Sequence, residues 1–459
     1  MQRAQRVSPV RIAAKRLRQV ADRPHTTIDA VDEEKVLGKL IKRIVPFLFI
    51  CYVVSYLDRV NVGFAALTMN KDIGLTPTAF GIGAGLFFFG YFIAEIPSNL
   101  IMMRVGARIW IARIMITWGI VSALTAFVTG PVQFAIARFL LGLGEAGFVP
   151  GVFLYISLWF PTSVKARATS LFLLGIPIAN IIGSPISGTL ITLEGFGLKG
   201  WQWLLILEAV PAVALGVACL FILTDQPEQA RWLTAAERNW LVARLAAEKA
   251  AIEKKHHLTL AQALRNWRVL MLAIINFCSI IGSLGVGLWL PQIMKQLGMS
   301  SFEVGFVSAL PYICGAIAMV VWARMSDRGT DRTLYPAISL FVGAAGLVTS
   351  TFLTSPAATI AALCVAVAGI NSYTATFWAV PSGFLTGRAA AGGIAMIVSI
   401  GNLGGFVGPF MIGQIRDITQ NFTAPLLAVA GFLLLGSVLM IAFGRLAARD
   451  ATTPAAAPA

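Results

Sequence analysis

Long apolar segments recur along the whole chain and are separated by short polar turns. Each segment is about 20 to 27 residues long, and a helix of about 20 apolar residues crosses the hydrocarbon core of a bilayer. The pattern therefore predicts an all-α integral membrane protein with twelve transmembrane helices. The expected spans are residues 44–69, 80–103, 109–129, 132–158, 168–192, 201–223, 269–293, 303–323, 334–354, 357–380, 392–413 and 424–445.

One long polar stretch interrupts this series after the sixth span. It contains Thr234 and Glu237, which stand three residues apart in the pattern of a helix N-terminus. The stretch predicts a cytoplasmic linker with a surface helix between two six-helix bundles. The expected divisions are a tail at 1–43, bundles at 44–223 and 269–445, the linker at 224–268 and a second tail at 446–459.

Short charged turns occupy matching positions in the two bundles. Arg104 and Arg108 follow the second span, and Asp327 and Arg328 follow the eighth. The match favours an internal duplication, hence two pseudo-symmetric bundles with gating turns and alternating access about a central cavity. Basic residues are common in all short cytoplasmic loops, so the turns would also arise without a duplication.

Composition indicates that the bilayer is the solvent of this chain. Hydrophobic residues make up 57% of it and charged residues 12%, whereas soluble proteins carry roughly a quarter charged residues. The net charge of +15 does not indicate a nucleic-acid partner, because about 30 of the 36 lysines and arginines fall on one side of the predicted topology. This asymmetry predicts a multi-pass protein of the bacterial inner membrane with both termini in the cytoplasm.

Neither the cysteines nor the histidines form a pattern typical of a metal or catalytic site. The five cysteines lie in apolar segments without a CxxC spacing, so we expect small buried side chains. His25, His256 and His257 lie in polar stretches, and no HExxH or GxSxG motif occurs. We therefore expect no metal, no cofactor and no enzymatic activity. A channel is not favoured either, since no ring of like residues repeats.

Two predicted spans each contain an acid and an arginine. Asp58 and Arg59 are near the middle of the first span, and Arg138 and Glu145 are in the fourth. A charge at the bilayer centre costs at least about 2.5–3.5 kcal/mol, so such a residue faces a cavity or a partner. Arg138 and Glu145 are seven residues apart, which places them on one helix face about 10 Å apart along the axis. All four residues can therefore line one cavity.

These residue types suit the coupling of an anion to protons. A buried carboxylate can be neutral in one state and charged in another, so Asp58 and Glu145 are the expected proton carriers. Arg59 and Arg138 stay charged, and a guanidinium matches a carboxylate in shape. One arginine should hold a substrate anion while the other modulates a carboxylate. The alternative is that the four residues form ion pairs that only fix the helix register.

Other polar residues in the spans carry weaker predictions. Glu95 and Glu208 are expected to serve helix packing and not cargo. A further set of aromatic, amide and hydroxyl side chains could shape a pocket for a small polar organic solute, although each alone is more typical of interhelical hydrogen bonding. The set comprises Tyr56, Tyr91, Asn180, Gln292, Tyr373, Trp378, Ser382 and Asn402.

Several runs of the sequence resemble one known family. They are the run from Ser55 to Ala65 (Ser-Tyr-Leu-Asp-Arg-Val-Asn-Val-Gly-Phe-Ala), the runs 96–100 and 144–148, and Trp201-Gln202-Trp203. These runs are similar to the anion:cation symporter family of the major facilitator superfamily, above all to bacterial tartrate and 4-hydroxyphenylacetate permeases. The resemblance extends from about residue 40 to residue 445 and implies the twelve-helix major facilitator fold.

The resemblance also implies residue roles. The acids of the first and fourth spans, here Asp58 and Glu145, would take protons, and Arg59 would hold the substrate carboxylate. Arg138 and Tyr91 match further positions of the family's pocket. The loop motif after the second span departs from the superfamily, because Asn99 and Met103 replace its usual glycine and aspartate. This departure puts the usual gating ion pair of that loop in doubt.

Residues and resemblance together predict a secondary active transporter that imports a small organic acid anion by proton symport. The expected substrate is a tartrate-like hydroxy acid or a hydroxyphenylacetate-like aromatic carboxylate, and the expected oligomeric state is a monomer in the lipid bilayer. The alternative is an uncoupled facilitator or an exchanger of organic anions, in which Asp58 and Glu145 are structural.

Overall fold

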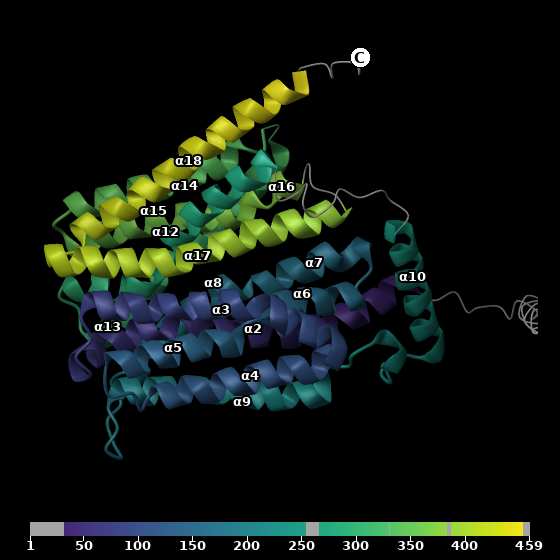
Figure 1. Cartoon of the computed structure of the whole chain (residues 1–459), viewed down its shortest axis with the longest axis horizontal. Helices are drawn as coiled ribbons and strands as arrows, with labels where there is room; N and C mark the ends of the chain where they lie inside the picture. Colours follow the sequence, from purple (N-terminus) through teal and green to yellow (C-terminus); the bar gives the residue numbers. More distant parts are fainter. Residues whose placement is uncertain (1–31, 254–265, 330, 383–386, 453–459) are drawn as a thin grey trace, which may run out of the picture.

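The computed structural model describes residues 32–253, 266–329, 331–382 and 387–452 (Figure 1). Within these ranges, twelve helices are long and apolar enough to cross a membrane, which confirms the prediction of twelve spans. The N-terminal half comprises α2 (Glu33–Asp72), α3 (Pro77–Val105), α4 (Ala107–Thr125), α5 (Pro131–Glu145), α6 (Phe148–Trp159), α7 (Thr162–Leu173), α8 (Gly175–Leu190) and α9 (Gly200–Ile222). The C-terminal half comprises α12 (Trp267–Gln296), α13 (Ser301–Arg328), α14 (Leu334–Phe352), α15 (Pro356–Phe377), α16 (Ala379–Ser382), α17 (Gly387–Thr419) and α18 (Thr423–Thr452).

Two terminal helices are longer than the apolar pattern predicts. The first helix begins at Glu33, inside the expected tail, because the Asp32 side chain accepts a hydrogen bond from Lys35 N at 3.1 Å and caps it. The last helix continues past residue 445 to Thr452. Most of the expected N-terminal tail, residues 1–31, lies outside the described residues. Polar extensions of this kind carry no hydropathy signal, so the apolar segments alone could not reveal them.

The two halves pack their helices in the same order. The second span packs on the fourth, the third on the sixth and the first on the fifth, as α3 on α5, α4 on α9 and α2 on α8. The C-terminal half repeats these pairings as α13 on α15, α14 on α18 and α12 on α17. Between the halves, the second span of each half contacts the fifth span of the other. These contacts are α3 with α17 and α13 with α8. This order is that of two pseudo-symmetric six-helix bundles.

The closest approaches between the halves lie at the end of the bundle away from the linker. A side chain at Gly63 of α2 would meet the Leu288 carbonyl of α12 at 2.5 Å, and one at Gly81 of α3 would meet the Pro409 carbonyl of α17 at 2.5 Å. Gly188 and Gly305 meet backbone to backbone between α8 and α13. Glycine allows such close backbone contact between membrane helices. The halves are therefore joined tightly at one end in this conformation.

Three spans are interrupted within their length. The fourth breaks at residues 146–147 between α5 and α6, the fifth breaks at residue 174, and the tenth breaks at residue 378. At the first break Gly147 has φ +88°, and a Cβ there would overlap the Ser98 hydroxyl, so glycine is required twice over. The break places Glu145 at the C-terminal end of α5, where the helix dipole disfavours a carboxylate. Glu145 therefore needs a cationic partner or a proton.

The linker contains η1 (Pro227–Gln229) and α10 (Ala235–Glu253), and the latter lies across one end of the N-terminal half (Figure 1). Glu237 forms a salt bridge of 2.5 Å with Lys39 of α2. Glu248 accepts hydrogen bonds from the backbone N–H and the hydroxyl of Thr162, at 2.9 and 2.7 Å, at the start of α7. The surface helix predicted from the linker sequence is present and is fastened to two spans.

Acidification should loosen this fastening. The hydrogen bond from Lys39 lowers the pKa of Glu237, and the bonds from Thr162 lower the pKa of Glu248 against the effect of burial. A carboxylate whose pKa is lowered on docking stabilises the docked helix at every pH above the ordinary carboxyl pKa of about 4.5. This stabilisation is lost as the pH falls through the lowered pKa. We expect hydrogen exchange in α10 to be equal at pH 8 and pH 6 and to rise below about pH 4.5, after correction for intrinsic exchange rates. Unchanged protection down to pH 3 would contradict this.

A candidate anion and proton site between helices of the N-terminal half

The centre of the N-terminal half holds a buried ion pair between two predicted site residues. Nη2 of Arg59 on α2 pairs with Oε1 of Glu145 on α5, and Glu145 is fully buried. Ser55, one turn before Arg59, donates a hydrogen bond of 2.9 Å to the same oxygen. The other oxygen of Glu145 has no hydrogen-bond partner among the described residues. The first and fourth spans are thus joined by one charge pair that leaves acceptor capacity free.

The second acid, Asp58, lies on a different face of α2. Its Oδ1 atom accepts hydrogen bonds from the hydroxyl of Ser122 on α4 and, at 3.2 Å, from the amide of Asn61. Its Oδ2 atom is buried and has no partner within the described part of the chain. No salt bridge joins Asp58 to a described arginine or lysine. Neutral donors therefore hold this carboxylate, in contrast to Glu145.

Aromatic rings surround the charged part of Arg59. Its guanidinium carbon lies 5.9 Å from the ring centroid of Tyr56, 5.3 Å from that of Tyr91 and 5.4 Å from that of Phe87. Phe87 also lies 4.9 Å from the guanidinium carbon of Arg138. One ring of α3 therefore contacts both arginines. Cation–π contacts stabilise a guanidinium that has left water.

Arg138 differs from Arg59 because it has donors to spare. Its side chain is 2% exposed, yet Nε and Nη2 have no hydrogen-bond partner among the residues the structure describes. Asp58, Glu145 and Arg59 are all within electrostatic range. In this conformation Glu145 is therefore paired with Arg59 and not with Arg138. Arg138 is left with a directional guanidinium that an anion could complete.

The C-terminal half contributes no charge to this region. Its spans contain no Asp, Glu, Lys or Arg over residues 269–294, 304–323, 334–382, 391–415 and 423–444. Tyr312 of α13 lies within electrostatic range of Tyr56 of α2. The C-terminal half therefore places a neutral hydroxyl group near the N-terminal half at this point. Over these ranges, the charged side chains of the central spans all belong to the N-terminal half.

Three predicted pocket residues of the C-terminal half have no recorded contact with the charged group. Trp378 is half-buried and packs edge-on against Phe377, with 5.2 Å between the ring centroids. Ser382 is exposed, and its hydroxyl donates to the Trp378 carbonyl at 2.7 Å. Asn402 is half-buried on α17. Their role in substrate binding stays a prediction.

Of the other three predicted polar residues, one borders the group formed by Asp58, Arg59, Arg138 and Glu145. Asn180 contacts Tyr56 and so borders the charged group. Gln292 accepts a hydrogen bond of 2.7 Å from Arg416 at the end of the bundle away from the linker. The Tyr373 hydroxyl is buried without a partner among the described residues.

The predicted gating turns differ from one another. Asp225, at the start of the linker, accepts a hydrogen bond of 2.8 Å from the Arg108 backbone and lies 3.8 Å from its Nε atom. Arg104, Asp327 and Arg328 are exposed, and no salt bridge to them occurs in the described ranges. Asp225 thus links the linker to the start of the third span, beside the turn in which the superfamily's loop motif is incomplete. Gating by Arg104, Asp327 and Arg328 stays a prediction.

Glu95 and Glu208 occupy different environments. Glu95 is half-buried near the linker end of α3, and its backbone carbonyl accepts a hydrogen bond of 2.9 Å from Asn99. Glu208 is buried on α9, and its side chain accepts a hydrogen bond from Ser187 of α8. The hydrogen bond from Ser187 joins α8 to α9, which agrees with the packing role expected of Glu208.

The prediction of buried cysteines is wrong at one position. Cys314 is exposed on α13 and Cys364 is half-buried, because lipid and not protein covers the outer face of a membrane helix. All five cysteines are free. Among the described residues no cluster of His, Cys, Asp and Glu could hold a metal ion.

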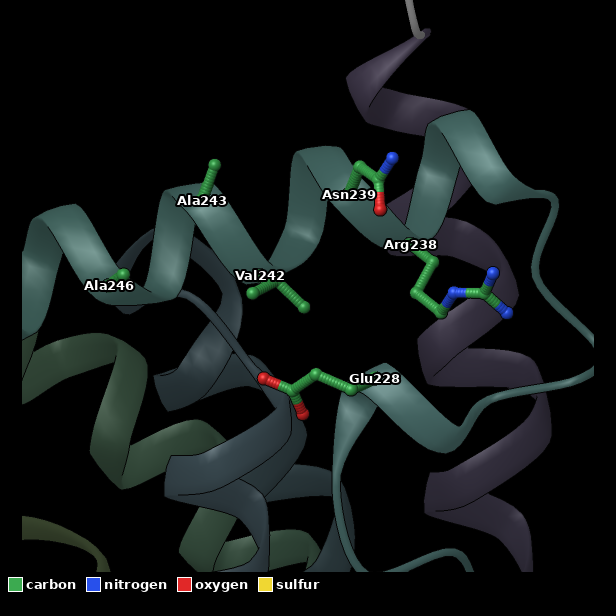
Figure 2. Close-up of a pocket in the computed structure, with 6 residues that line it drawn as sticks. All are labelled: Glu228, Arg238, Asn239, Val242, Ala243 and Ala246. Atoms are coloured by element: carbon green, nitrogen blue, oxygen red, sulfur yellow. The ribbon is translucent and has the colours of Figure 1, made fainter. Parts of the chain in front are cut away.

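A surface hollow lies elsewhere, between η1 and α10 (Figure 2). Its lining combines Glu228, Arg238 and the amide of Asn239 with small, apolar side chains of α10. None of the buried charged residues of the spans borders it. The hollow is therefore separate from the candidate site.

Sequence reasoning missed the residues that hold the charges in place. Phe87 is an ordinary apolar residue of an apolar span, and Ser55 and Ser122 are small hydroxyls that membrane helices often contain. Asn61 lies three residues after Asp58, so helical periodicity could have placed it on the same face. Only the folded arrangement identifies the other three.

Twelve membrane-spanning helices form two repeated bundles, and the N-terminal bundle encloses a buried, partly unpaired group of charges, an arrangement typical of a secondary membrane transporter. The chain belongs to the major facilitator superfamily, whose family model matches residues 48–409, and this family and the transporters related to it indicate a transporter and not an enzyme. It is therefore a multi-pass protein of the inner membrane that moves a small molecule. The family resemblance noted in the sequence is confirmed.

The chain is similar to proteins named as transporters, and the similarity covers nearly the whole length of both chains. A protein of Agrobacterium vitis named "Putative tartrate transporter" is 52% identical over 414 residues, which cover 90% of this chain and 92% of that protein. A "Quinolone resistance transporter" of Acinetobacter baumannii is 41% identical and covers 89% of this chain and 94% of its own length. A bacterial homologue of the lysosomal transporter Spinster, solved in an inward-facing conformation, has the same fold with a TM-score of 0.76 at 14% identity, over 90% of this chain and 99% of its own.

Proposed function

We propose that this protein imports a small organic acid anion together with protons. The observation that carries the proposal is the Arg59–Glu145 ion pair beside an Arg138 whose donors are unpartnered. A fully buried acid and base that serve only structure would be expected to satisfy each other more completely. The relative named for tartrate supports an organic acid as cargo.

The ion pair suggests how proton and cargo are linked. While Glu145 is charged, it occupies Arg59. When Glu145 takes a proton, its attraction for Arg59 falls, and the guanidinium becomes available to a substrate carboxylate beside Arg138. Release of the proton on the other side restores the pair and expels the anion. Binding of the proton and of the anion therefore favour each other, as coupling requires.

Charge counting sets the driving force. Asp58, Glu145, Arg59 and Arg138 sum to zero when all are ionised, so two protons create two positive charges for the anion to offset. Two protons with a monoanion move one net positive charge inward, and each 100 mV then contributes about 2.3 kcal/mol. Each unit of pH gradient adds about 1.4 kcal/mol per proton. We infer that uptake of a monoanion is electrogenic. We also infer, from the distribution of lysines and arginines over the predicted topology, that both termini face the cytoplasm.

The decisive experiment is a ligand panel on the purified protein. Tartrate, sugar acids, 4-hydroxyphenylacetate and phthalate are compared in thermal unfolding with neutral amides of the same skeletons. A ligand at 100 times its Kd stabilises the protein by about 2.7 kcal/mol. We expect stabilisation by at least one hydroxy acid or aromatic acid and none by its amide. Stabilisation by neutral or cationic compounds alone would exclude the proposal.

Electrogenic proton flux separates symport from its alternatives. Substrate added to proteoliposomes should alkalinise the medium and produce an inward current. A facilitator or an exchanger of organic anions, in which the two acids are structural, would equilibrate or swap the substrate without either signal.

Phe87→Leu should weaken substrate binding, because it removes the ring that contacts both arginines. A cation–π contact is worth about 0.5–2 kcal/mol, so we expect Kd to rise about 2- to 30-fold. Titration calorimetry with the substrate from the panel measures this change. Phe80→Leu is the matched control, since Phe80 packs on Phe134 and Trp289 and has no recorded contact with an arginine. Equal losses in both variants would show that the effect is one of packing.

A further inference from the structure

Tyr312 of α13 is a half-buried tyrosine whose hydroxyl lies beside Gly287 of α12. A Cβ atom added at Gly287 would meet this hydroxyl at 3.4 Å and, outside its own helix, no other described atom within 4 Å. No hydrogen bond to the Tyr312 hydroxyl occurs within the described part of the chain. A phenol with a free donor and a free acceptor next to unfilled space can bind a polar group of a ligand.

The helix contacts place Tyr312 at the depth of the central charges. Gly305, two turns before Tyr312 on the same face of α13, meets Gly188 of α8 backbone to backbone. From the end of the bundle away from the linker, Tyr312 lies about 16 Å along α13 and Arg59 about 20 Å along α2, at 1.5 Å per residue. Tyr56, whose ring centroid is 5.9 Å from the Arg59 guanidinium carbon, is within electrostatic range of Tyr312, which agrees with this placement.

We propose that Tyr312 binds the hydroxylated, uncharged part of the substrate anion while Arg59 and Arg138 hold its charge. The C-terminal spans carry no charged residue over the ranges given above, so a carboxylate against Tyr312 would lose water without gaining a cation. A neutral hydroxyl group needs one donor and one acceptor there, and a phenol supplies both. Tyr312 is thus a specificity-determining residue, and the preferred cargo is an organic acid that carries a hydroxyl group.

This inference deepens the proposed function, because it rests on an organic anion held by the two arginines. A hydroxylated acid would contact both halves at once, whereas an acid without a hydroxyl group would leave the Tyr312 hydroxyl unpaired. An unpaired polar group in a closed site costs binding free energy. The site should therefore discriminate between two acids that differ only in this group.

Tyr312→Phe tests the inference with matched pairs of ligands. Tartrate is compared with succinate, and 4-hydroxyphenylacetate with phenylacetate, by titration calorimetry on the purified protein. Each pair shares its carboxylates and differs in its hydroxyl groups. One net hydrogen bond corresponds to about a 2- to 12-fold difference in Kd, so the wild type should prefer the hydroxylated member of at least one pair by that factor. In Tyr312→Phe this preference should fall to about one.

Tyr335→Phe is the matched control. Tyr335 is also a half-buried tyrosine of the C-terminal half, but it packs edge-on against Trp322, with 5.5 Å between the ring centroids, near the start of α14. This variant should keep the preference of the wild type. A packing role for Tyr312 would raise the Kd of both members of a pair equally and leave their ratio unchanged.

Gly287→Ala tests the space beside the hydroxyl. Alanine is the better helix former, and the added methyl group would approach only the Tyr312 hydroxyl among the described atoms of other helices, so the ligand-free protein should be at least as stable as the wild type. The methyl group would occupy the place of the ligand's hydroxyl group. The Kd of the preferred acid should therefore rise at least about fivefold.

Three results would overturn the inference while an organic acid remains the cargo. They are a wild type without preference for either hydroxylated acid, a preference that survives in Tyr312→Phe, and an unchanged Kd in Gly287→Ala. If the wild type binds no organic acid at all, the proposed function itself is wrong, and the role of Tyr312 is rejected with it.

Discussion

Asp58→Asn is expected to abolish accumulation of the substrate against its gradient while leaving exchange intact. Asparagine imitates a protonated aspartate that can neither load nor release its proton, and it keeps a hydrogen-bonding partner for Ser122. A carrier that cannot release this proton cannot complete the return step without substrate, so net uptake stops whatever the second acid does. The accumulation ratio under a pH gradient should therefore fall to about one. Counterflow of labelled against unlabelled substrate needs no net proton movement and should continue.

Glu95→Gln is the matched control for this variant. It also neutralises an acid within a span, but Glu95 is half-buried and has no salt bridge among the described residues. We expect it to retain at least half of the wild-type accumulation. If Asp58→Asn accumulates substrate as well as Glu95→Gln does, proton coupling through Asp58 is wrong, and a structural role for this acid becomes the better interpretation.

Arg138→Gln should lower substrate affinity by at least a hundredfold. A hydrogen bond to a charged group contributes about 1.5–3 kcal/mol, and Arg138 has two donors without partners in the described structure. Binding of the panel's best ligand, measured by calorimetry, reports this loss. Arg138→Lys should recover little affinity, since an ammonium cannot reproduce the planar pair of donors.

Arg113→Gln serves as the control for the loss of a partly buried arginine. Arg113 lies on α4, where its guanidinium carbon is 4.0 Å from the ring centroid of Trp110. Within the described part of the chain, no contact joins it to the four central charges. Its substitution should change the substrate Kd by less than about twofold, because no charge-assisted bond to cargo is lost. Comparable losses for both arginines would point to general destabilisation.

The fold was predictable because apolar length is a strong signal. Twenty apolar residues have one stable way to cross a bilayer, so each span could be read without knowledge of its neighbours. The interruptions could not be read in this way. The break before Phe148 depends on a left-handed Gly147 seated against Ser98, a contact between two spans. Nor could the polar first turn at Glu33 be recognised, since it lies outside the hydrocarbon.

The candidate site was predictable in its charged residues and not in its pairings. Charges within a span are costly enough to identify Asp58, Arg59, Arg138 and Glu145 from the sequence alone. Spacing could not determine which arginine meets which acid, because Arg59 and Glu145 lie on different helices. The same limitation hid the contact between Asn61 and Glu208.

The absence of charged residues from the central parts of the C-terminal spans also bears on how the protein is made. Each ionised group in the first or fourth span adds about 2.5–3.5 kcal/mol to the free energy of membrane insertion, whereas the spans of the C-terminal half carry no such cost near the bilayer centre. The translocon should thus release the C-terminal helices into lipid one by one. The first and fourth spans gain a partner only when Arg59 meets Glu145, so the first should wait beside the translocon until the fourth has been synthesised.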